Sequence, residues 1–398
     1  MKLLFVVSED WYFRSHRLPV ALAARKAGWD VGLAAQVSDA APEIERADIR
    51  IHPLRLRRGS VNPLRDLGYL IRLYRLYRRE KPDLVHHVAM KPVLYGSIAA
   101  RLARIPCVVN ALAGMGYLST ADRPHIRLIG RLVLFCFRRL FNRPQTLLIV
   151  QNATDREALE RAGVAPDRIR LIRGSGVDLA VFRPPSARPV RAVARAVMVS
   201  RLLLDKGVAE YAQAARLLRE RKAPVRLVLV GAPDSANPHA VPQTLLDEAQ
   251  ADGALEMPGQ RSDVHDLYRE ADMAVLPSYR EGLPKSLIEA AACGLPIVTT
   301  DVAGCRETVG GLNGNPPITP INAKTNWQQG ENGIVVPPRN AEALAAAIGF
   351  LAERPELRAD MGRASRALAE QKFGIEKAVE QTMAVYHELR LAADSGHG

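Results

Sequence analysis

The feature that most constrains the fold of this chain is a long alternation of short apolar runs with longer amphipathic stretches. The apolar runs have the length of buried strands, and the stretches between them have helical periodicity. The expected strands are 3–7, 31–35, 84–86, 107–110, 147–150, 196–199, 226–230, 274–276 and 297–299. The expected helices are 17–27, 63–79, 93–103, 126–141, 208–221, 264–270, 286–293 and 341–353. Alternating βα units predict an α/β protein with parallel sheets covered on both faces.

The alternation restarts near residue 196, which predicts two doubly wound domains in the 398 residues. The boundary is expected at 182–189, where three prolines and no apolar period are typical of a linker. The domains are then 1–182 and 190–373. Since open α/β sheets bind ligands at the carboxyl ends of their strands, two facing domains predict a cleft between them. The Gly-, Asn- and Pro-rich segment 310–330 is expected to be either a solvated surface loop or a lid over that cleft.

The net charge of +13 comes entirely from the first half of the chain. Residues 1–180 carry 30 Lys and Arg against 16 Asp and Glu, whereas the remainder carries 25 against 26. This asymmetry predicts an anionic partner for the first half: nucleic acid, acidic lipid or a phosphorylated substrate. Nucleic acid is disfavoured because only 5% of residues are aromatic and no nucleic-acid-binding motif is present.

Three basic stretches, 55–58, 65–79 and 125–143, place cations beside Leu, Ile, Tyr and Phe. Each stretch alone can be a solvated helix face. Together they predict a surface that docks on anionic lipid, and hence peripheral attachment to the inner face of the cytoplasmic membrane.

Several other classes of protein are disfavoured. The four cysteines are scattered without a C-x-x-C pair, which supports neither a disulfide framework nor a zinc site and fits a reducing cytosol. Residues 1–7 are too short for the apolar region of a signal peptide, and 126–137 falls short of the ~20 apolar residues of a spanning helix. The chain has no complete G-x-G-x-x-G, Walker A, H-E-x-x-H or G-x-S-x-G motif, which disfavours nicotinamide enzymes, P-loop proteins, zincins and hydrolases.

The most informative segment, 278–290, places Glu281 and Glu289 around a turn and a helix start after an expected strand. A helix start offers unpaired N–H groups and a positive dipole end, which suit a phosphate. One carboxylate on each side of a phosphate suits a sugar nucleotide, although an isolated pair at this spacing is also typical of a capping residue and a solvated glutamate. Arg201 and Lys206 follow another strand, where cations can neutralise a pyrophosphate.

With these residues in view, the chain resembles the family 4 glycosyltransferases, retaining enzymes of the GT-B architecture. The resemblance covers nearly the whole chain. Its matching blocks are 174–178, 200–202, 206–207, 230–231, 259–261, 263–264 and 281–307.

The resemblance implies that Arg201 and Lys206 hold the donor diphosphate, Glu289 the ribose and Glu281 the transferred sugar. It further implies donor contacts from the backbone around the phosphates and near the base: Gly231, Gly259, Arg261, Gly282, Leu283, Pro284, Lys285, Ser286 and Leu287. No metal and no cofactor are implied, because the nucleotide sugar is a co-substrate. The helix at 374–391 would cross back onto the first domain and complete it.

The first domain resembles a narrower branch, which extends polyprenyl-diphosphate-linked sugars in bacterial surface glycan assembly. The segments that carry this likeness are 8–19 and 110–117. Two positions depart from the branch: Glu9-Asp10-Trp11 replaces a Gly-Gly pair, and Ala113 replaces a catalytic His. The expected acceptor-binding residues are Asp10, His86, Lys91 and Gly114, and His16, in a loop expected to face the cleft, is the first candidate for a catalytic histidine.

The sequence therefore predicts a glycosyltransferase that moves a hexose or N-acetylhexosamine, with retention, from a nucleoside-diphosphate sugar to a lipid-linked saccharide. UDP is the expected donor nucleotide, and lipopolysaccharide or capsule is the expected product class. Two alternatives stay open: a UDP-sugar 2-epimerase on the same fold, and a catalytically weak membrane-bound scaffold. The sequence leaves the donor sugar, the acceptor and the oligomeric state undetermined.

Overall fold

The computed structural model describes residues 1–56, 63–112, 114, 124–188, 191–234, 237, 239–312 and 327–395. Its contacts divide the chain into two compact units, Met1–Gly176 with Ile375–Gly398, and Val177–Gly374, called unit 1 and unit 2 below. The chain passes between the units at 176–177 and at 374–375. The described part of the proline-containing segment 182–189 lies inside unit 2.

Unit 1 is built on a parallel sheet of order β3-β2-β1-β4-β5-β6-β7. Its strands are β1 (Lys2–Glu9), β2 (Asp30–Gln36), β3 (Arg50–Pro53), β4 (Leu84–Val88), β5 (Cys107–Ala111), β6 (Thr146–Val150) and β7 (Ile169–Leu171). Its helices are α1 (Asp10–His16), α2 (Leu18–Lys26), α3 (Ala41–Arg46), α4 (Pro63–Glu80), α5 (Met90–Ala103), α7 (Pro124–Phe141), α8 (Ala153–Arg161) and α16 (Ile375–Ser395), with a 3₁₀ turn at Pro166–Arg168.

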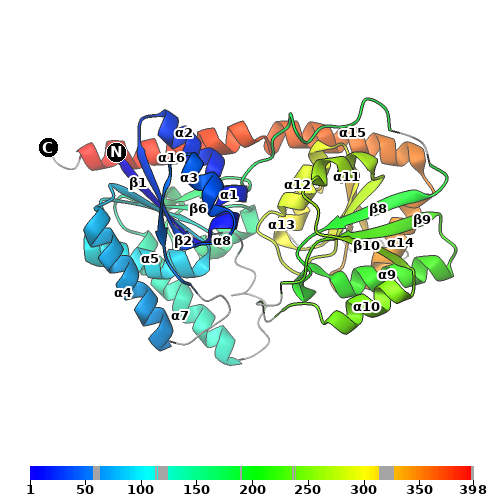
Figure 1. Ribbon diagram of the computed structural model, residues 1–398, viewed down its shortest axis with the longest axis horizontal. Coiled ribbons are helices and arrows are strands. Elements are labelled where there is room, and N and C mark those ends of the chain that lie inside the picture. The colour runs from blue at the N-terminus through cyan, green and yellow to red at the C-terminus, as the bar shows by residue number, and fades with distance from the viewer. Residues whose placement is uncertain are drawn as a thin grey trace. The chain divides into compact units, whose positions relative to one another are not determined.

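The apolar run of β1 is buried on both faces because successive side chains of a strand point to opposite sides. Leu3, Phe5 and Val7 pack in a core with α2 and α16, whereas Leu4 and Val6 pack in a second core with α4 and α5. Figure 1 shows the two helix layers on either side of this sheet. Helix α8, which the sequence pattern did not predict, begins at a capping Asn152 whose side-chain oxygen accepts the N–H of Asp155.

Unit 2 has a sheet of order β10-β9-β8-β11-β12-β14-β13, parallel except for the edge pair β13·β14. Its strands are β8 (Ala194–Val199), β9 (Val225–Val230), β10 (Leu255–Gly259), β11 (Met273–Leu276), β12 (Ile297–Thr300), β13 (Gln328–Gln329) and β14 (Gly333–Val336). Its helices are α9 (Val208–Glu220), α10 (Gln243–Ala251), α11 (Val264–Glu270), α12 (Lys285–Ala292), α13 (Ala303–Arg306), α14 (Ala341–Ala352) and α15 (Pro355–Lys372), with a 3₁₀ turn η2 (Leu204–Lys206).

Each unit is therefore a doubly wound α/β sheet, and the predicted fold class is confirmed. One local expectation was wrong: residues 10–16 form helix α1 rather than a loop, because Asp10 starts a helix whose Phe13 is buried against Phe5. Residues 313–326, the middle of the predicted loop or lid, lie outside the described residues.

Candidate active site

The strand order of unit 2 reverses at β8 and β11, which lie side by side at the middle of the sheet. Ligands of open α/β sheets bind at such a switch point, beyond the carboxyl ends of the strands. The loop after β8 carries Arg201 and Lys206, and the loop after β11 carries Glu281. The fold therefore brings these sequence-predicted residues to one edge of unit 2.

Lys206 and Glu281 form an ion pair across this switch point, and both side chains are mostly buried. Lys206 ends η2, and Gly207 follows it with a φ of +75°. A Cβ on Gly207 would overlap the carbonyl oxygen of Pro277, at the end of β11. Glycine is needed at 207 because of this backbone angle and because of this close approach. The loop that carries Lys206 therefore packs directly on the loop that carries Glu281, which we call the glutamate loop.

Asp205 also connects these two loops, through hydrogen bonds and an ion pair. Its carbonyl oxygen accepts the hydroxyl of Ser278 at 2.9 Å and the N–H of Tyr279 at 2.8 Å. Its carboxylate pairs with Arg280 and lies 3.3 Å from His239. The loops therefore form one hydrogen-bonded structure, which limits the positions that Lys206 and Glu281 can take.

Helix α12 begins directly after the glutamate loop, and its N-cap, Pro284, makes no side-chain capping bond. The first N–H groups of a helix have no acceptor within the helix, so this start can receive an anion. Glu289 lies one turn further along, with its carboxylate 3.7 Å from the ammonium of Lys285. Burial raises the pKa of Glu289 to about 7, against the opposing effect of Lys285. Glu289 is thus a desolvated carboxyl group on the helix that starts at the switch point.

The loop after β12 packs on the backbone of this site. A Cβ on Gly304, in α13, would overlap the backbone of Glu281 and Gly282. An ion pair between Asp301 and Arg306 holds the turn that leads into α13. The Thr300 hydroxyl donates to the carbonyl of Ser278, which ties β12 to the glutamate loop. The backbone from Gly282 to Leu287 is therefore supported from β12 as well as from β8.

The remaining donor-side candidates occupy the carboxyl ends of β9 and β10. The N–H of Gly231 donates to the carbonyl of Gly259 at 3.0 Å, so the two glycines meet. Arg261 pairs with Asp263 on the surface, and the guanidinium lowers the pKa of Asp263 to about 2. Arg201 pairs with Asp234 at 3.0 Å and stays partly exposed. All these side chains belong to the same edge of the sheet, although Arg201 and Arg261 have partners other than Lys206 and Glu281.

In unit 1, the predicted residues of the first segment lie on α1. The Asp10 carboxylate is fully buried and accepts the Ser38 N–H at 2.6 Å, so it joins α1 to the end of β2. His16 is the last residue of α1, where its ring stacks on Tyr12 with centroids 4.1 Å apart. Asp10 thus has a structural role, and His16 lies on a helix rather than in a loop.

The other unit 1 candidates have different environments. His86 is fully buried in β4 and bonds through Nδ1 to the hydroxyl of Tyr386 in α16. Burial lowers its pKa well below the ordinary value, so the ring is neutral at neutral pH. Lys91, in α5, lies 2.9 Å from the carboxylate of Asp66 in α4. Gly114 has a φ of +113°, and Ala113 lies outside the described residues.

The four cysteines are all described and none is in a disulfide. Burial raises the pKa of the Cys305 thiol, near Glu281, to about 12, so it stays protonated. Within the described ranges, no group of three or more His, Cys, Asp or Glu side chains could hold a metal ion. Among the helices that the structure describes, none is long and apolar enough to cross a membrane.

Sequence reasoning did not find several polar residues of this edge. Tyr279 donates to Glu210, and the guanidinium of Arg339 lies over the Tyr279 ring, 4.8 Å from its centroid. Arg339 follows β14 after two prolines, Pro337 and Pro338, and directly precedes the capping Asn340 of α14. The sequence signal that could have identified Arg339 is its position between an apolar run and a helix-capping residue. That position places it at the carboxyl edge of the unit 2 sheet.

Two family models match the chain on either side of the unit boundary. "Glycosyl transferase 4-like" matches residues 2–152, and "Glycosyl transferases group 1" matches residues 192–368. The chain is a family 4, group 1 glycosyltransferase. In this glycosyltransferase, the second match spans the whole Lys206–Glu281 site and helix α12.

Similar proteins act on lipid-linked sugars. An N,N'-diacetylbacillosaminyl-diphospho-undecaprenol α-1,3-N-acetylgalactosaminyltransferase of Campylobacter jejuni is 24% identical over 87% of this chain and 88% of its own length. A UDP-Gal:α-D-GlcNAc-diphosphoundecaprenol α-1,3-galactosyltransferase of Escherichia coli is 28% identical over 62% of this chain and 64% of its own.

The solved structures establish the fold. Anabaena HepE, solved in complex with UDP and glucose, superposes with a TM-score of 0.73 at 19% identity, covering 98% of this chain and all of its own. The sucrose-phosphate synthase of Thermosynechococcus elongatus gives 0.74 at 20% identity, with 98% and 100% coverage. These similarities confirm the predicted GT-B fold of two Rossmann-like sheets.

Proposed function

We propose that the glycosyltransferase moves a hexose or N-acetylhexosamine from UDP, with retention, to a polyprenyl-diphosphate-linked saccharide. The observation that carries the donor half is the Lys206–Glu281 ion pair at the switch point of unit 2, directly before the start of α12. A cation beside an open helix start suits a diphosphate, and a carboxylate in the same cluster suits the hydroxyls of a sugar.

The roles of the residues follow from this placement. Lys206 and Arg201 stabilise the negative charge that builds on the diphosphate as the bond to the sugar breaks. Glu289 accepts hydrogen bonds from the ribose, and Glu281 accepts one from the transferred sugar. The acceptor hydroxyl attacks on the face that the diphosphate leaves, and its proton passes to a diphosphate oxygen, so configuration is retained without a protein base. The backbone of 282–287 holds the phosphates, with Gly231 and the segment 259–261 near the nucleobase.

We assign the acceptor to unit 1, the first domain, which the C-terminal helix completes, and the donor to unit 2, the second domain. Lys91 and Gly114 closely follow the carboxyl ends of β4 and β5, the edge where the sheet of unit 1 would bind a ligand, and His16 ends α1, the helix that follows β1. Asp10 and His86 shape this edge from within the core. The names of the similar enzymes from C. jejuni and E. coli support an undecaprenyl-diphosphate-linked acceptor.

Such an acceptor lies in a membrane, and α4 offers a surface for docking there. Leu67, Ile71 and Tyr74 form an exposed apolar stripe at positions i, i+4 and i+7. Arg75 and Arg78 are exposed on the same helix. An apolar stripe with arginines beside it is the pattern of a helix that lies on an anionic lipid surface. We therefore place the enzyme in the cytoplasm, peripheral to the inner face of the cytoplasmic membrane.

The test is transfer of labelled sugar from a panel of nucleotide sugars to a polyprenyl-diphosphate saccharide, with Glu281→Ala and Arg216→Gln in parallel. Arg216 lies on α9 and pairs with Asp252, outside the site, so Arg216→Gln is the control for folding. Label in the lipid fraction for one donor, lost with Glu281→Ala and kept with Arg216→Gln, supports the proposal. A donor altered without any acceptor would indicate an epimerase, and nucleotide binding without chemistry would indicate a scaffold.

A further inference from the structure

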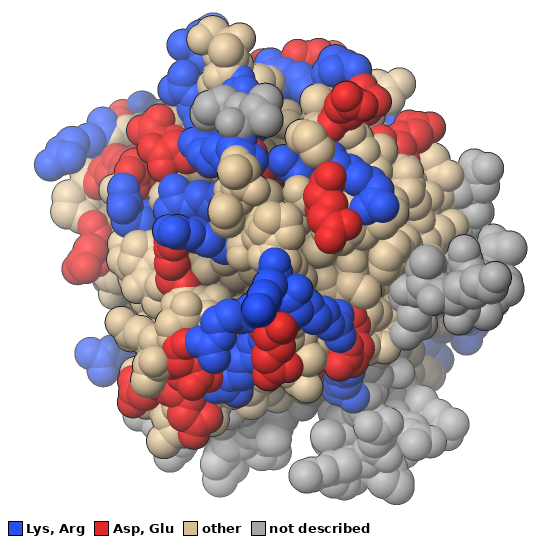
Figure 2. Space-filling view, turned by 90° about the vertical axis from the view of Figure 1, so that its right-hand side faces the viewer, with Lys and Arg blue, Asp and Glu red and all other residues tan. Residues whose placement is uncertain are grey.

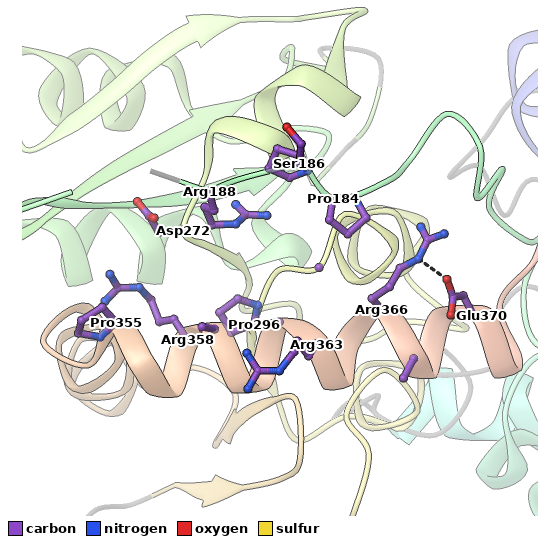
Figure 3. Close-up of a pocket in the computed structure, with 15 residues that line it drawn as sticks. Pro184, Ser186, Arg188, Asp272, Pro296, Pro355, Arg358, Arg363, Arg366 and Glu370 are labelled. Carbon is purple, nitrogen blue, oxygen red and sulfur yellow. Dashed lines mark hydrogen bonds and ion pairs between the residues drawn. The ribbon is translucent and has the colours of Figure 1, made fainter. Parts of the chain in front are cut away.

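Unit 2 has a recess at the amino edge of its sheet, the edge opposite the candidate active site. We call it the α15 pocket. Its volume is about 590 Å³, within the range of small-molecule sites. One wall is α15, from Pro355 to Glu370, and the facing wall is the segment from Pro184 to Arg188 (Figure 3). Asp272 and Pro296, directly before β11 and β12, form the floor.

The pocket is rich in arginine. Arg358, Arg363 and Arg366 come from α15 and Arg188 from the facing segment, against the two acids Asp272 and Glu370. Burial lowers the pKa of both Arg188 and Arg358, and in each case Asp272 is the main group that opposes this effect. Four cations against two acids leave the lining positive, so it favours an anionic ligand.

Arg358 is the best-placed of these cations. Its residue is only 7% exposed, and its Nη1 donates to the carbonyls of Leu351 and Ala352 at the end of α14. Within the described residues, its Nε and Nη2 have no hydrogen-bond or ion-pair partner. A guanidinium fixed by one nitrogen, with two others available beside a cavity, is positioned to bind a phosphate or carboxylate through two parallel bonds.

The pocket is also joined to the helix of the donor site. Arg366 donates to the carbonyl of Ala292 at 2.8 Å, and Arg188 donates to the carbonyl of Cys293 at 2.9 Å. Both carbonyls belong to the C-terminal end of α12, whose other end carries Lys285 and Glu289. Because Arg188 and Arg366 also line the pocket, an anion bound at Arg358 acts electrostatically on the two guanidiniums that hold this end of α12. The pocket and the switch point therefore share one rigid element.

We propose that the α15 pocket binds a small phosphate-bearing molecule, and that this binding is coupled through α12 to the affinity for the nucleotide. The four prolines of the lining provide apolar surface for the body of such a ligand, Arg358 provides the phosphate contact, and Arg363 adds a positive charge at the rim. The coupling rests on the donor site assigned above, whereas the pocket itself does not.

The binding test uses alanine methyl NMR of the full chain, because Ala359 and Ala367 line the pocket. Inorganic phosphate and glucose 6-phosphate are titrated separately, to distinguish free phosphate from a phosphorylated metabolite. We expect saturable shifts of both methyl signals with at least one probe. Arg363→Gln should weaken binding by about fivefold or more, since it removes one positive charge from the lining. Arg363 is largely exposed, and its one ion pair among the described residues is with Asp360, so this variant should fold.

Three further variants make the outcome decisive. Ala359→Trp fills the pocket without removing an arginine and should abolish the shift of Ala367, while Arg216→Gln, on α9, should leave it unchanged. Lys206→Gln should also keep the pocket shifts. If Lys206→Gln removes the shifts and Arg363→Gln does not, or if neither probe shifts Ala359 and Ala367, the pocket is not a phosphate site.

The coupling is read by calorimetry of UDP with and without the saturating probe. A change in UDP affinity of about fivefold or more, lost with Arg363→Gln, supports coupling. If the probe instead competes with UDP at the switch point, the change in UDP affinity will persist in Arg363→Gln. That result would contradict the coupling. If UDP does not bind at all, the proposed donor site fails, while the methyl shifts still decide the pocket.

Discussion

Gly207 is the residue on which the geometry of the candidate site depends most directly. Alanine there must adopt a φ near +75° and place a methyl group against the Pro277 carbonyl. Gly253 is a matched control, since its φ is +63° but a Cβ there would meet nothing within 4 Å. We expect Gly253→Ala to cost roughly 1 kcal/mol of stability and Gly207→Ala about 2–4 kcal/mol, with weaker UDP binding only in the latter. Urea unfolding and calorimetry measure both, and equal effects of the two substitutions would contradict the packing described.

Glu289 predicts a pH dependence. Its pKa is raised from 4.5 to about 7 by burial, so the protonated form stabilises the fold. That contribution is fully present below pH 4.5 and is lost as the pH rises through 7, because the buried carboxyl group must then ionise. Relative to Glu289→Gln, the wild type should lose up to about 3 kcal/mol between pH 4.5 and 8. A pH-independent difference in the urea unfolding free energy of the two proteins would show that Glu289 is not desolvated.

At this scale, the sequence could predict residues but not their partners. Lys206 and Glu281 were found because each follows an apolar run that ends at the same edge of a parallel sheet. The role of Asp205 depends on which loops lie side by side, which is a tertiary property. His86 was predicted at the acceptor edge, but the two helix layers that cover β4 place it in the core.

Helix α4 is the element whose exposed face bears on membrane attachment. The double substitution Arg75→Gln with Arg78→Gln should weaken binding to anionic liposomes by on the order of 30-fold, since each arginine near such a surface contributes about 1 kcal/mol. Arg221→Gln with Arg226→Gln removes the same charge from unit 2, where Figure 2 shows cations and anions interleaved on the visible face. Co-sedimentation at low salt compares the two proteins, and equal losses would mean that net charge, rather than α4, governs attachment.

Helix α16 completes unit 1 although it is the last element of the chain. Ala378, Val385, Tyr386 and Leu389 are buried in the core that includes β1 and α2. Tyr386→Phe leaves the Nδ1 of His86 without its hydroxyl partner and should cost about 1–3 kcal/mol. Tyr74→Phe, at an exposed position of α4, should cost almost nothing. Equal unfolding midpoints of the two variants in urea would contradict the docking of α16 on β4.

At the element scale, the central strands and the helices α4, α5, α7, α9 and α14 were predictable because their patterns extend over many residues, whereas α8, α10 and α15 were missed. The short strands β3, β7, β10, β13 and β14 were missed. The first four are edge strands that are short or carry mixed polar residues, and β14 has only four residues. Edge strands depend on a neighbour for their pairing, so their own sequence carries a weak signal.

For the whole molecule, the two-sheet architecture follows from the repeated βα pattern, and the basic excess of the first half has no counterpart in the second. The expected cleft between the domains and the identity of donor and acceptor remain predictions. The division of roles that we propose assigns the donor to unit 2 and the lipid-linked acceptor to the basic unit 1.

The most direct test of the central claim is calorimetric titration of UDP into the wild type and into Arg201→Gln with Lys206→Gln, with Arg216→Gln as the control. Each lost charge-assisted contact is worth about 1.5–3 kcal/mol, so the double variant should bind UDP at least 100-fold more weakly. The control should bind as the wild type does. Undiminished UDP binding by the double variant would contradict a donor site at the switch point of unit 2.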